Sequence, residues 1–202
     1  MQNNSELIFQ KIYPKNLIIV SGITRSGKSL VCPIISSLKN CEKFELNYNL
    51  EKLMYLRYNK KISDEVFSYL FSYNINQDCY NLKISRKVNF RYDDFTSIWK
   101  SKLPNLFFQR MRVKEGDMIF KNMTQSKDHF IYVMHNVLIY CNLLFKIKKD
   151  LKIVNVLRNP IDIIYSWLKK NYGTNDYGSP RMQSVNYKIG KKFYPGFLNK
   201  KY

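Results

Sequence analysis

The stretch Leu17-Ile18-Ile19-Val20-Ser21-Gly22-Ile23-Thr24-Arg25-Ser26-Gly27-Lys28-Ser29 decides the fold of this 202-residue chain. Its first four residues form a continuous apolar run, as in a strand buried on both faces of a parallel sheet. From Gly22 to Ser29 the spacing is that of a phosphate-binding loop, in which glycines let the backbone approach an anion. Apolar residues then recur at helical spacing at Leu30, Val31, Ile34, Ile35 and Leu38. A strand, a glycine loop and a helix in this order predict that backbone N–H groups and the positive helix end hold an anionic nucleotide. The simpler alternative is an ordinary glycine turn.

Two later apolar runs indicate further strands of the same sheet. One covers 131–134 and is followed by His135, and the other covers 152–157 and is followed by Arg158. Helical spacing over 63–82 and around 95–99 precedes the first run, and helical spacing over 137–145 separates the two runs. This alternation predicts an α/β protein, a three-layer P-loop fold with a central parallel sheet flanked by helices and ligands at the carboxyl ends of the strands. The length favours a single domain over residues 1–202.

The loop alone is also typical of a magnesium-dependent kinase or NTPase. In such an enzyme Lys28 would reach the β- and γ-phosphates, Ser29 would ligate magnesium, and an acidic residue at the end of a later strand would hold the ion. The two later strands end at His135 and Arg158 instead, and Asp162 belongs to the start of a helix. A P-loop nucleotide or small-molecule kinase therefore stays the second hypothesis.

A second motif follows the strand at 152–157. Arg158-Asn159-Pro160 precedes a helical segment that contains Ser166. Pro160 suits the first position of a helix, where its missing N–H costs nothing. The forked donors of Arg158 and the hydroxyl of Ser166 are suited to a second phosphate. Seen alone, the pair would be an arginine at a strand end and a serine on a helix.

Together, these residues resemble the sulfotransferase family that uses 3′-phosphoadenosine 5′-phosphosulfate (PAPS). The family's 5′-phosphosulfate loop, Pro-Arg/Lys-Ser-Gly-Thr-Thr, is matched by 24–29, with a lysine where the fifth residue is usually threonine. Its 3′-phosphate motif, Arg-Asx-Pro with a serine eight positions after the arginine, is matched by 158–166. The resemblance spans about 150 residues and implies PAPS as cofactor, no metal, and a short or truncated member. The cofactor-binding residues that it implies are Gly22, Thr24, Arg25, Ser26, Gly27, Lys28, Ser29, Arg158 and Ser166.

The resemblance also implies an activity: transfer of a sulfuryl group from PAPS to a hydroxyl or amine of a small-molecule, lipid or saccharide acceptor. Arg25 stands where the family has the basic residue that touches the oxygen between sulfate and phosphate. Its permanent charge suits an oxygen on which negative charge develops.

Two residues compete for the role of the base that removes the acceptor proton. His135 resembles the histidine of the Lys-Thr-His segment in cytosolic sulfotransferases, and histidine side chains ordinarily titrate near neutral pH. Other branches of the family use a glutamate shortly after the first helix. Glu45 fits that position better than Glu42 if its two neighbours face inward on a strand. A structural histidine and solvated carboxylates are the alternatives, and His129 is a weaker candidate.

Composition narrows the remaining classes. Neither a signal peptide pattern nor an apolar run of membrane-spanning length occurs, so a cytoplasmic protein without a membrane span is expected. The cysteines lack the spacing of a zinc site or a disulfide framework, which predicts reduced thiols at Cys32, Cys41, Cys79 and Cys141. Glycines and prolines after Trp167 predict a loop.

The formal net charge of +19 favours an anionic ligand. The basic excess is concentrated from Lys146 onward, near the second motif, and would also attract an anionic acceptor. A non-catalytic module that binds a nucleotide or nucleic acid is the third hypothesis. Because no RNA-binding aromatic motif or zinc finger occurs, nucleic acid is the least favoured partner.

Overall fold

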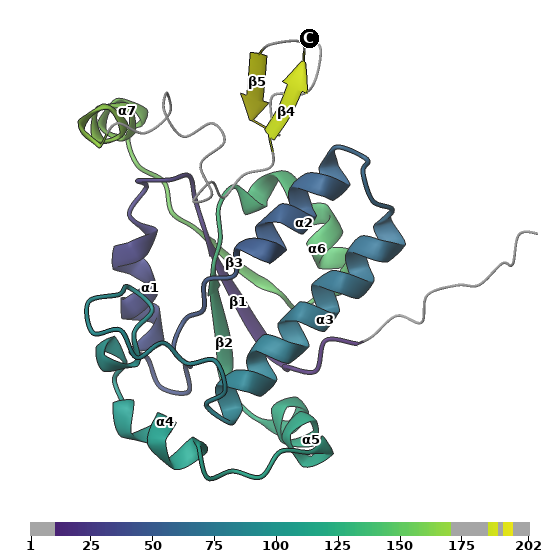
Figure 1. The fold of residues 1–202 in the computed structure, drawn as a ribbon, viewed down its shortest axis with the longest axis vertical. Coiled ribbons are helices and arrows are strands. Elements are labelled where there is room, and N and C mark those ends of the chain that lie inside the picture. The colour runs from purple at the N-terminus through teal and green to yellow at the C-terminus, as the bar shows by residue number, and fades with distance from the viewer. Residues whose placement is uncertain (1–10, 171–185, 190–191, 196–202) are drawn as a thin grey trace, which may run out of the picture.

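The computed structural model describes residues 11–170 and two strands at 186–189 and 192–195 (Figure 1). None of the helices in this described part is long and apolar enough to cross a membrane. In chain order the elements, with η for a 3-10 helix, are β1 (Asn16–Ser21), α1 (Lys28–Ser36), α2 (Tyr48–Tyr58), α3 (Asp64–Lys83), η1 (Ile98–Lys100), α4 (Pro104–Arg110), α5 (Asp117–Gln125), β2 (His129–Val133), η2 (Val137–Tyr140), α6 (Cys141–Ile147), β3 (Lys152–Asn155), α7 (Pro160–Lys169), β4 (Asn186–Ile189) and β5 (Lys192–Pro195).

The central element is a three-stranded sheet of order β2-β1-β3. β1 pairs in parallel with β2 along its first five residues and with β3 along its last four. Because the strands share one direction, their carboxyl ends meet at one edge of the sheet, where the glycine loop 22–27, His135 and Arg158 follow. The prediction of an α/β fold with a central parallel sheet flanked by helices is confirmed at this level.

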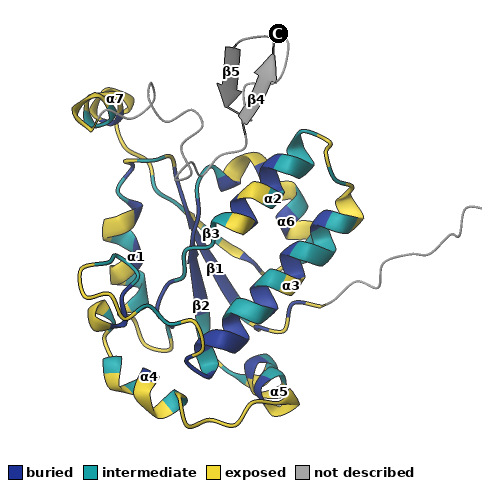
Figure 2. Ribbon diagram, in the orientation of Figure 1, coloured by how far each residue is buried: buried dark blue, intermediate teal, exposed yellow. Residues whose placement is uncertain are grey.

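Each face of the sheet packs against its own helices, because side chains alternate along a strand (Figure 2). On one face, residues of β1 and β2 join a large core with α2, α3 and α6, which includes Leu17, Ile19, Phe130, Tyr132, Leu50, Phe67, Phe71, Ile75 and Leu144. On the other face, a smaller core joins the sheet to α1 and contains Ile18, Val20, Ile131, Val133, Cys32 and Phe44.

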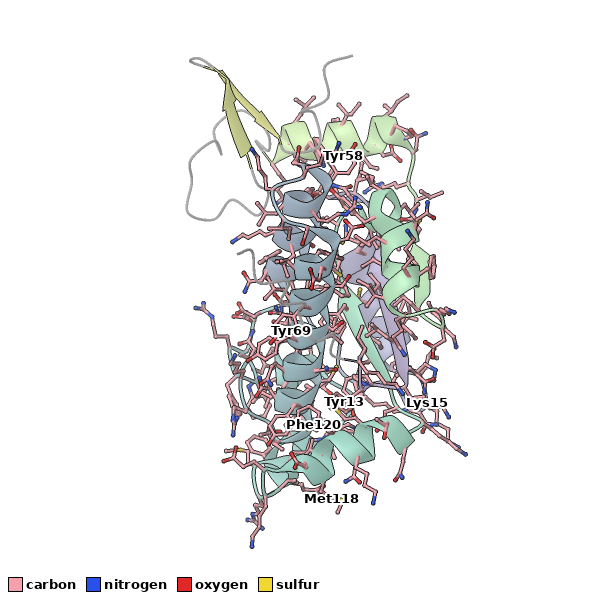
Figure 3. All side chains as sticks on the ribbon, turned by 90° about the vertical axis from the view of Figure 1, so that its right-hand side faces the viewer. Tyr13, Lys15, Tyr58, Tyr69, Met118 and Phe120 are labelled. Carbon is pink, nitrogen blue, oxygen red and sulfur yellow. The ribbon has the colours of Figure 1, made fainter. Side chains whose placement is uncertain are left out.

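α3 is the longest helix and confirms the helical spacing predicted over 63–82. Ser63 caps it, since its Oγ accepts a hydrogen bond from the N–H of Val66 at 3.1 Å. Figure 3 shows this helix lengthwise, with Tyr69 on it and α5 near its end. There Phe120 of α5 contacts Tyr13, and the ring centroids are 4.9 Å apart. The contact ties the segment ahead of β1 to the helical layer.

The apolar residues that predicted a helix after the glycine loop divide between two sides of α1. Cys32 is fully buried, and Val31 and Ile35 pack against the same core. Leu30 and Ile34, by contrast, are 70% and 58% exposed. A spacing of four residues places these two on one outward stripe, whereas the three inward residues form another. The helix predicted from the apolar spacing is confirmed, and the structure adds which of its sides faces the sheet.

Three local predictions need correction. The helix expected around 95–99 is only the short η1, because Pro104 already begins the next helix. The strand expected over 152–157 ends at Asn155, and Leu157 is 84% exposed. The loop expected after Trp167 is wrong in the described segments, since α7 continues to Lys169 and β4 pairs antiparallel with β5. The rest of that expected loop, 171–185, 190–191 and 196–202, lies outside the described residues. β4 and β5 have four residues each. Strands this short give too little alternation of apolar and polar residues to be recognised in a sequence with glycines nearby.

Candidate functional site

The loop between β1 and α1 depends on two glycines. Gly22 has a φ of 150°, and a Cβ there would lie 2.6 Å from both Ser26 Oγ and the carbonyl oxygen of Val156. Gly27 has a φ of 106° and precedes α1 without a side-chain cap. The first N–H groups of α1 therefore have no intrahelical acceptor and point out of the positive helix end. This arrangement suits an anion.

Two polar side chains lie buried beneath the loop. Lys28 Nζ donates to the carbonyl oxygens of Gly22 at 2.8 Å and Ile23 at 2.7 Å. Burial lowers the pKa of Lys28 from 10.5 to about 8, although the charge of Glu51 opposes the change. Ser26 Oγ is buried and has no hydrogen-bond partner within the described residues. An ammonium group has three donors, so one N–H of Lys28 and the Ser26 hydroxyl remain for a ligand.

The second motif lies directly against the loop. Arg25 Nε donates to Ser166 Oγ at 2.8 Å, and Arg158 Nη1 donates to the carbonyl oxygen of Arg25 at 3.4 Å. Trp167 Nε1 donates to the carbonyl oxygen of Thr24 at 3.0 Å. Segments more than 130 residues apart in the sequence thus form one corner beside the carboxyl ends of β1 and β3 (Figure 1). The structure brings the two motifs together.

The residues considered for magnesium lie at the rim of this corner. Ser29 is exposed in the first turn of α1. Asp162 has a side chain that is 59% exposed, and one of its carboxylate oxygens is 3.8 Å from Arg158 Nε.

His135 has a buried partner that sequence analysis missed. Glu51, in the first turn of α2, accepts from the backbone N–H of His135 at 2.8 Å, and the same oxygen is 2.9 Å from His135 Nδ1. The Glu51 side chain is only 2% exposed. Its charge also acts on Lys28, which links the histidine to the loop electrostatically. A signal was present, because Glu51 lies on a helical stretch between Leu50 and Met54, both buried.

Glu45, the other candidate base, belongs to a separate cluster. It forms a β-bridge with Tyr132, and its carboxylate pairs with Lys43 Nζ at 2.7 Å. Burial raises the pKa of Glu45, against the opposing charge of Lys43. Its neighbours Phe44 and Leu46 pack against the core on the α1 side, which is the condition under which Glu45 fits the position of the base better than Glu42. Within the described residues, no contact joins Glu45 to the loop.

The two weaker candidates, Glu42 and His129, lie toward the other end of the sheet. Glu42 is held by Lys83 Nζ at 2.6 Å and by both terminal nitrogens of Arg110 at 2.7 and 2.9 Å. Burial opposes its ionisation, but these cations outweigh burial and keep the pKa of Glu42 below its usual value. His129 begins β2, so the whole strand separates it from His135. Within the described residues, neither Glu42 nor His129 has a hydrogen bond or ion pair to the loop between β1 and α1.

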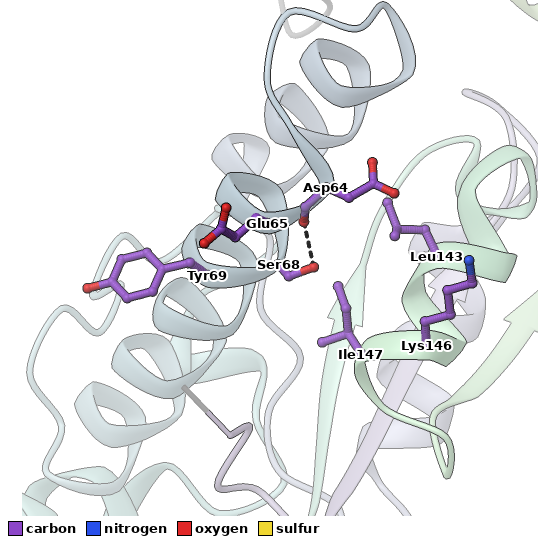
Figure 4. Close-up of a pocket in the computed structure, with 7 residues that line it drawn as sticks. All are labelled: Asp64, Glu65, Ser68, Tyr69, Leu143, Lys146 and Ile147. Atoms are coloured by element: carbon purple, nitrogen blue, oxygen red, sulfur yellow. Dashed lines mark hydrogen bonds between the residues drawn. The ribbon is translucent and has the colours of Figure 1, made fainter. Parts of the chain in front are cut away.

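A hollow of about 350 Å³ lies between α3 and α6 (Figure 4). Its lining residues are Asp64, Glu65, Ser68, Tyr69, Leu143, Lys146 and Ile147. The carboxylate of Asp64 already accepts two hydrogen bonds from Arg57, at 2.7 and 2.9 Å. This hollow contains none of the loop residues.

Comparison with protein-family models, curated proteins and solved structures found no match. The chemistry of the corner formed by the loop and the second motif is therefore the basis for a function.

Proposed function

We propose that this protein is a PAPS-dependent sulfotransferase with a P-loop fold. It would transfer a sulfuryl group to a hydroxyl or amine of a small-molecule, lipid or saccharide acceptor. The observation that carries the proposal is the pair of contacts from Arg25 to Ser166 and from Arg158 to Arg25. They unite a phosphate loop with a second set of phosphate donors, as a nucleotide with both 5′ and 3′ phosphates requires.

The 5′ side of the nucleotide would be held by the loop. The N–H groups at the start of α1, the Ser26 hydroxyl and Lys28 all present donors without a full set of partners. A dianion near Lys28 favours its charged form, and thereby offsets the burial that lowers its pKa. The loop thus gains a charge-assisted bond when the ligand arrives.

The 3′ phosphate would be held by Arg158 and Ser166. The Ser166 oxygen accepts from Arg25 and still has its own O–H to donate. Arg25 uses Nε for this contact, which leaves its terminal nitrogens for the oxygen between phosphate and sulfate. PAPS supplies the activated sulfuryl group, and Arg25 stabilises the charge that develops on the leaving oxygen.

In this proposal His135 is the base that removes the proton of the acceptor hydroxyl or amine. With Nδ1 donating to Glu51, a neutral imidazole keeps Nε2 as the acceptor. The buried carboxylate of Glu51 orients the ring and stabilises the imidazolium that forms. Glu45 remains the competing base, but its contacts lead to Lys43 rather than to the loop. We expect the Glu45→Gln variant to retain transfer activity and the His135→Ala variant to lose it.

A magnesium-dependent kinase is the second candidate. Lys28-Ser29 restores the loop ending of a P-loop kinase, and Ser29 is exposed in the first turn of α1. The two functions differ in their need for a metal, because sulfuryl transfer from PAPS can proceed without one.

Calorimetric titration separates these candidates. We expect adenosine 3′,5′-bisphosphate to bind more than tenfold tighter than AMP. AMP lacks the 3′ phosphate and therefore one charge-assisted contact, which contributes about 1.5–3 kcal/mol. Arg158→Ala should remove this preference. Lys169→Ala, which removes an exposed charge from α7, should preserve it. Equal affinities in the unmutated protein would contradict the 3′-phosphate site. Tight binding of ATP that requires magnesium would instead favour the kinase.

A further inference from the structure

A second hollow lies at the other end of α1 from the phosphate loop. It has a volume of about 610 Å³ and is bordered by the end of α1, the segment 38–44, the segment 95–103 and α4. α1 begins at Lys28, and Pro33 and Ser36 of the same helix border the hollow. At ~1.5 Å per helical residue, roughly 10 Å of helix separates the two places. A molecule in this hollow is thus distinct from one on the loop.

The hollow has an apolar floor. Phe44 and Phe107 are buried, and the ring of Phe95 lies 4.5 Å from that of Phe44 between centroids. Leu103 and Leu106 complete the apolar lining, and Leu103 is 58% exposed. A space of this size with aromatic and aliphatic walls is typical of a small-molecule site.

Acidic groups in the lining are already neutralised. The carboxylate of Glu42 is shared by Lys83 and Arg110, and that of Asp128 accepts from Lys83 at 2.5 Å. Lys43 in turn pairs with Glu45. The positive and negative charges of these ion pairs balance, so little net charge remains at the base of the hollow.

The rim, by contrast, is cationic. Lys39, Lys100 and Lys102 line the opening, and none of them pairs with a carboxylate within the described residues. Lys100 Nζ donates to the carbonyl oxygen of Asp93, and Lys102 Nζ to that of Ser37, so each keeps further N–H donors. Three ammonium groups around an apolar floor select a ligand with a negative head and an apolar body.

We propose that this hollow is a second ligand site, for a small organic anion with an aromatic or aliphatic body. The floor takes the apolar part, and the lysines of the rim bind the anionic group. The proposal is independent of the phosphate loop and holds whether or not the loop binds PAPS.

The probe for the test is 1-anilinonaphthalene-8-sulfonate, followed by its fluorescence and displaced by dodecanoate. We expect the triple variant Lys39→Ala/Lys100→Ala/Lys102→Ala to bind the probe at least tenfold more weakly. The matched control, Lys52→Ala/Lys114→Ala/Lys121→Ala, removes three exposed charges elsewhere and should bind as the unmutated protein does. Circular dichroism verifies that both variants remain folded.

Two further measurements locate the probe. Leu106→Trp fills the hollow and should abolish binding, whereas Lys28→Met, at the loop, should leave it unchanged. Cys41 lines the hollow and is partly exposed, so its alkylation in the unmutated protein should slow about tenfold when nine-tenths of the sites are occupied. Mass spectrometry of the Cys41 peptide measures this without any mutation. Unchanged affinity in the rim variant, loss of binding in Lys28→Met, or alkylation unaffected by the probe would each overturn the proposal.

Discussion

Lys28 should couple nucleotide binding to uptake of a proton. Its pKa is about 8 in the free protein because burial disfavours the charged form. A bound phosphate dianion favours that form and raises the pKa of Lys28 back toward its ordinary value of 10.5. The unbound protein is about half deprotonated at this lysine at pH 8, so binding should take up about 0.5 proton there. The same arithmetic gives about 0.1 proton at pH 7 and about 0.9 at pH 9.

The affinity for the nucleotide must fall as Lys28 loses its proton. Between pH 7 and pH 9 the dissociation constant of adenosine 3′,5′-bisphosphate should rise about tenfold, or about 1.4 kcal/mol. Calorimetry in two buffers of different ionisation enthalpy measures the proton uptake directly. Lys28→Arg is the control, because a guanidinium keeps its charge throughout this range. The reasoning fails if the unmutated protein binds equally well at pH 7 and pH 9, or if Lys28→Arg takes up as many protons.

Three other outcomes test other parts of the molecule. Gly22→Ala should lower stability by about 1–3 kcal/mol, since its Cβ would lie 2.6 Å from a carbonyl oxygen; thermal melting measures this, and an unchanged melting temperature would argue against the loop geometry. His135→Ala should slow transfer by about 10²–10⁴, and Glu51→Gln should slow it less; steady-state rates equal to that of the unmutated protein would make the pair structural. Glu42→Gln should cost about 3 kcal/mol in urea unfolding at neutral pH. Because the folded-state pKa of Glu42 is lowered, its stabilisation exists above about pH 4.5 and disappears as the pH falls, so the variant should lose less stability on acidification than the unmutated protein.

The parts of the fold that sequence could predict depend on local patterns. The run of four apolar residues before Gly22 marks β1, and the glycine spacing marks a turn that other residues cannot adopt. Ser63 and the acidic residues after it mark the start of α3. Each of these signals depends on residues that are neighbours in the sequence, so the sequence alone suffices to predict the element.

What sequence could not predict depends on contacts between distant segments. The meeting of Glu51 with His135 requires α2 to lie beside the carboxyl end of β2, 84 residues later. The contact of Arg25 with Ser166 bridges 141 residues. Similarly, which side of α1 faces the sheet depends on Cys32 fitting against the strands rather than on the larger Leu30. Apolar spacing identifies a helix, but the shape of its neighbour selects the buried side.

The hydrogen bond from Trp167 to the loop gives this protein an intrinsic optical reporter. Its sequence contains only two tryptophans, and the other, Trp99, lies in η1 beside the hollow at the far end of α1. Indole emission responds to the polarity around the ring, so each tryptophan reports on its own end of the helix. In Trp99→Phe the remaining emission comes from Trp167, next to Thr24, and in Trp167→Phe it comes from the segment that borders the hollow. The fluorescence of these two variants can thus follow occupancy of the two places separately.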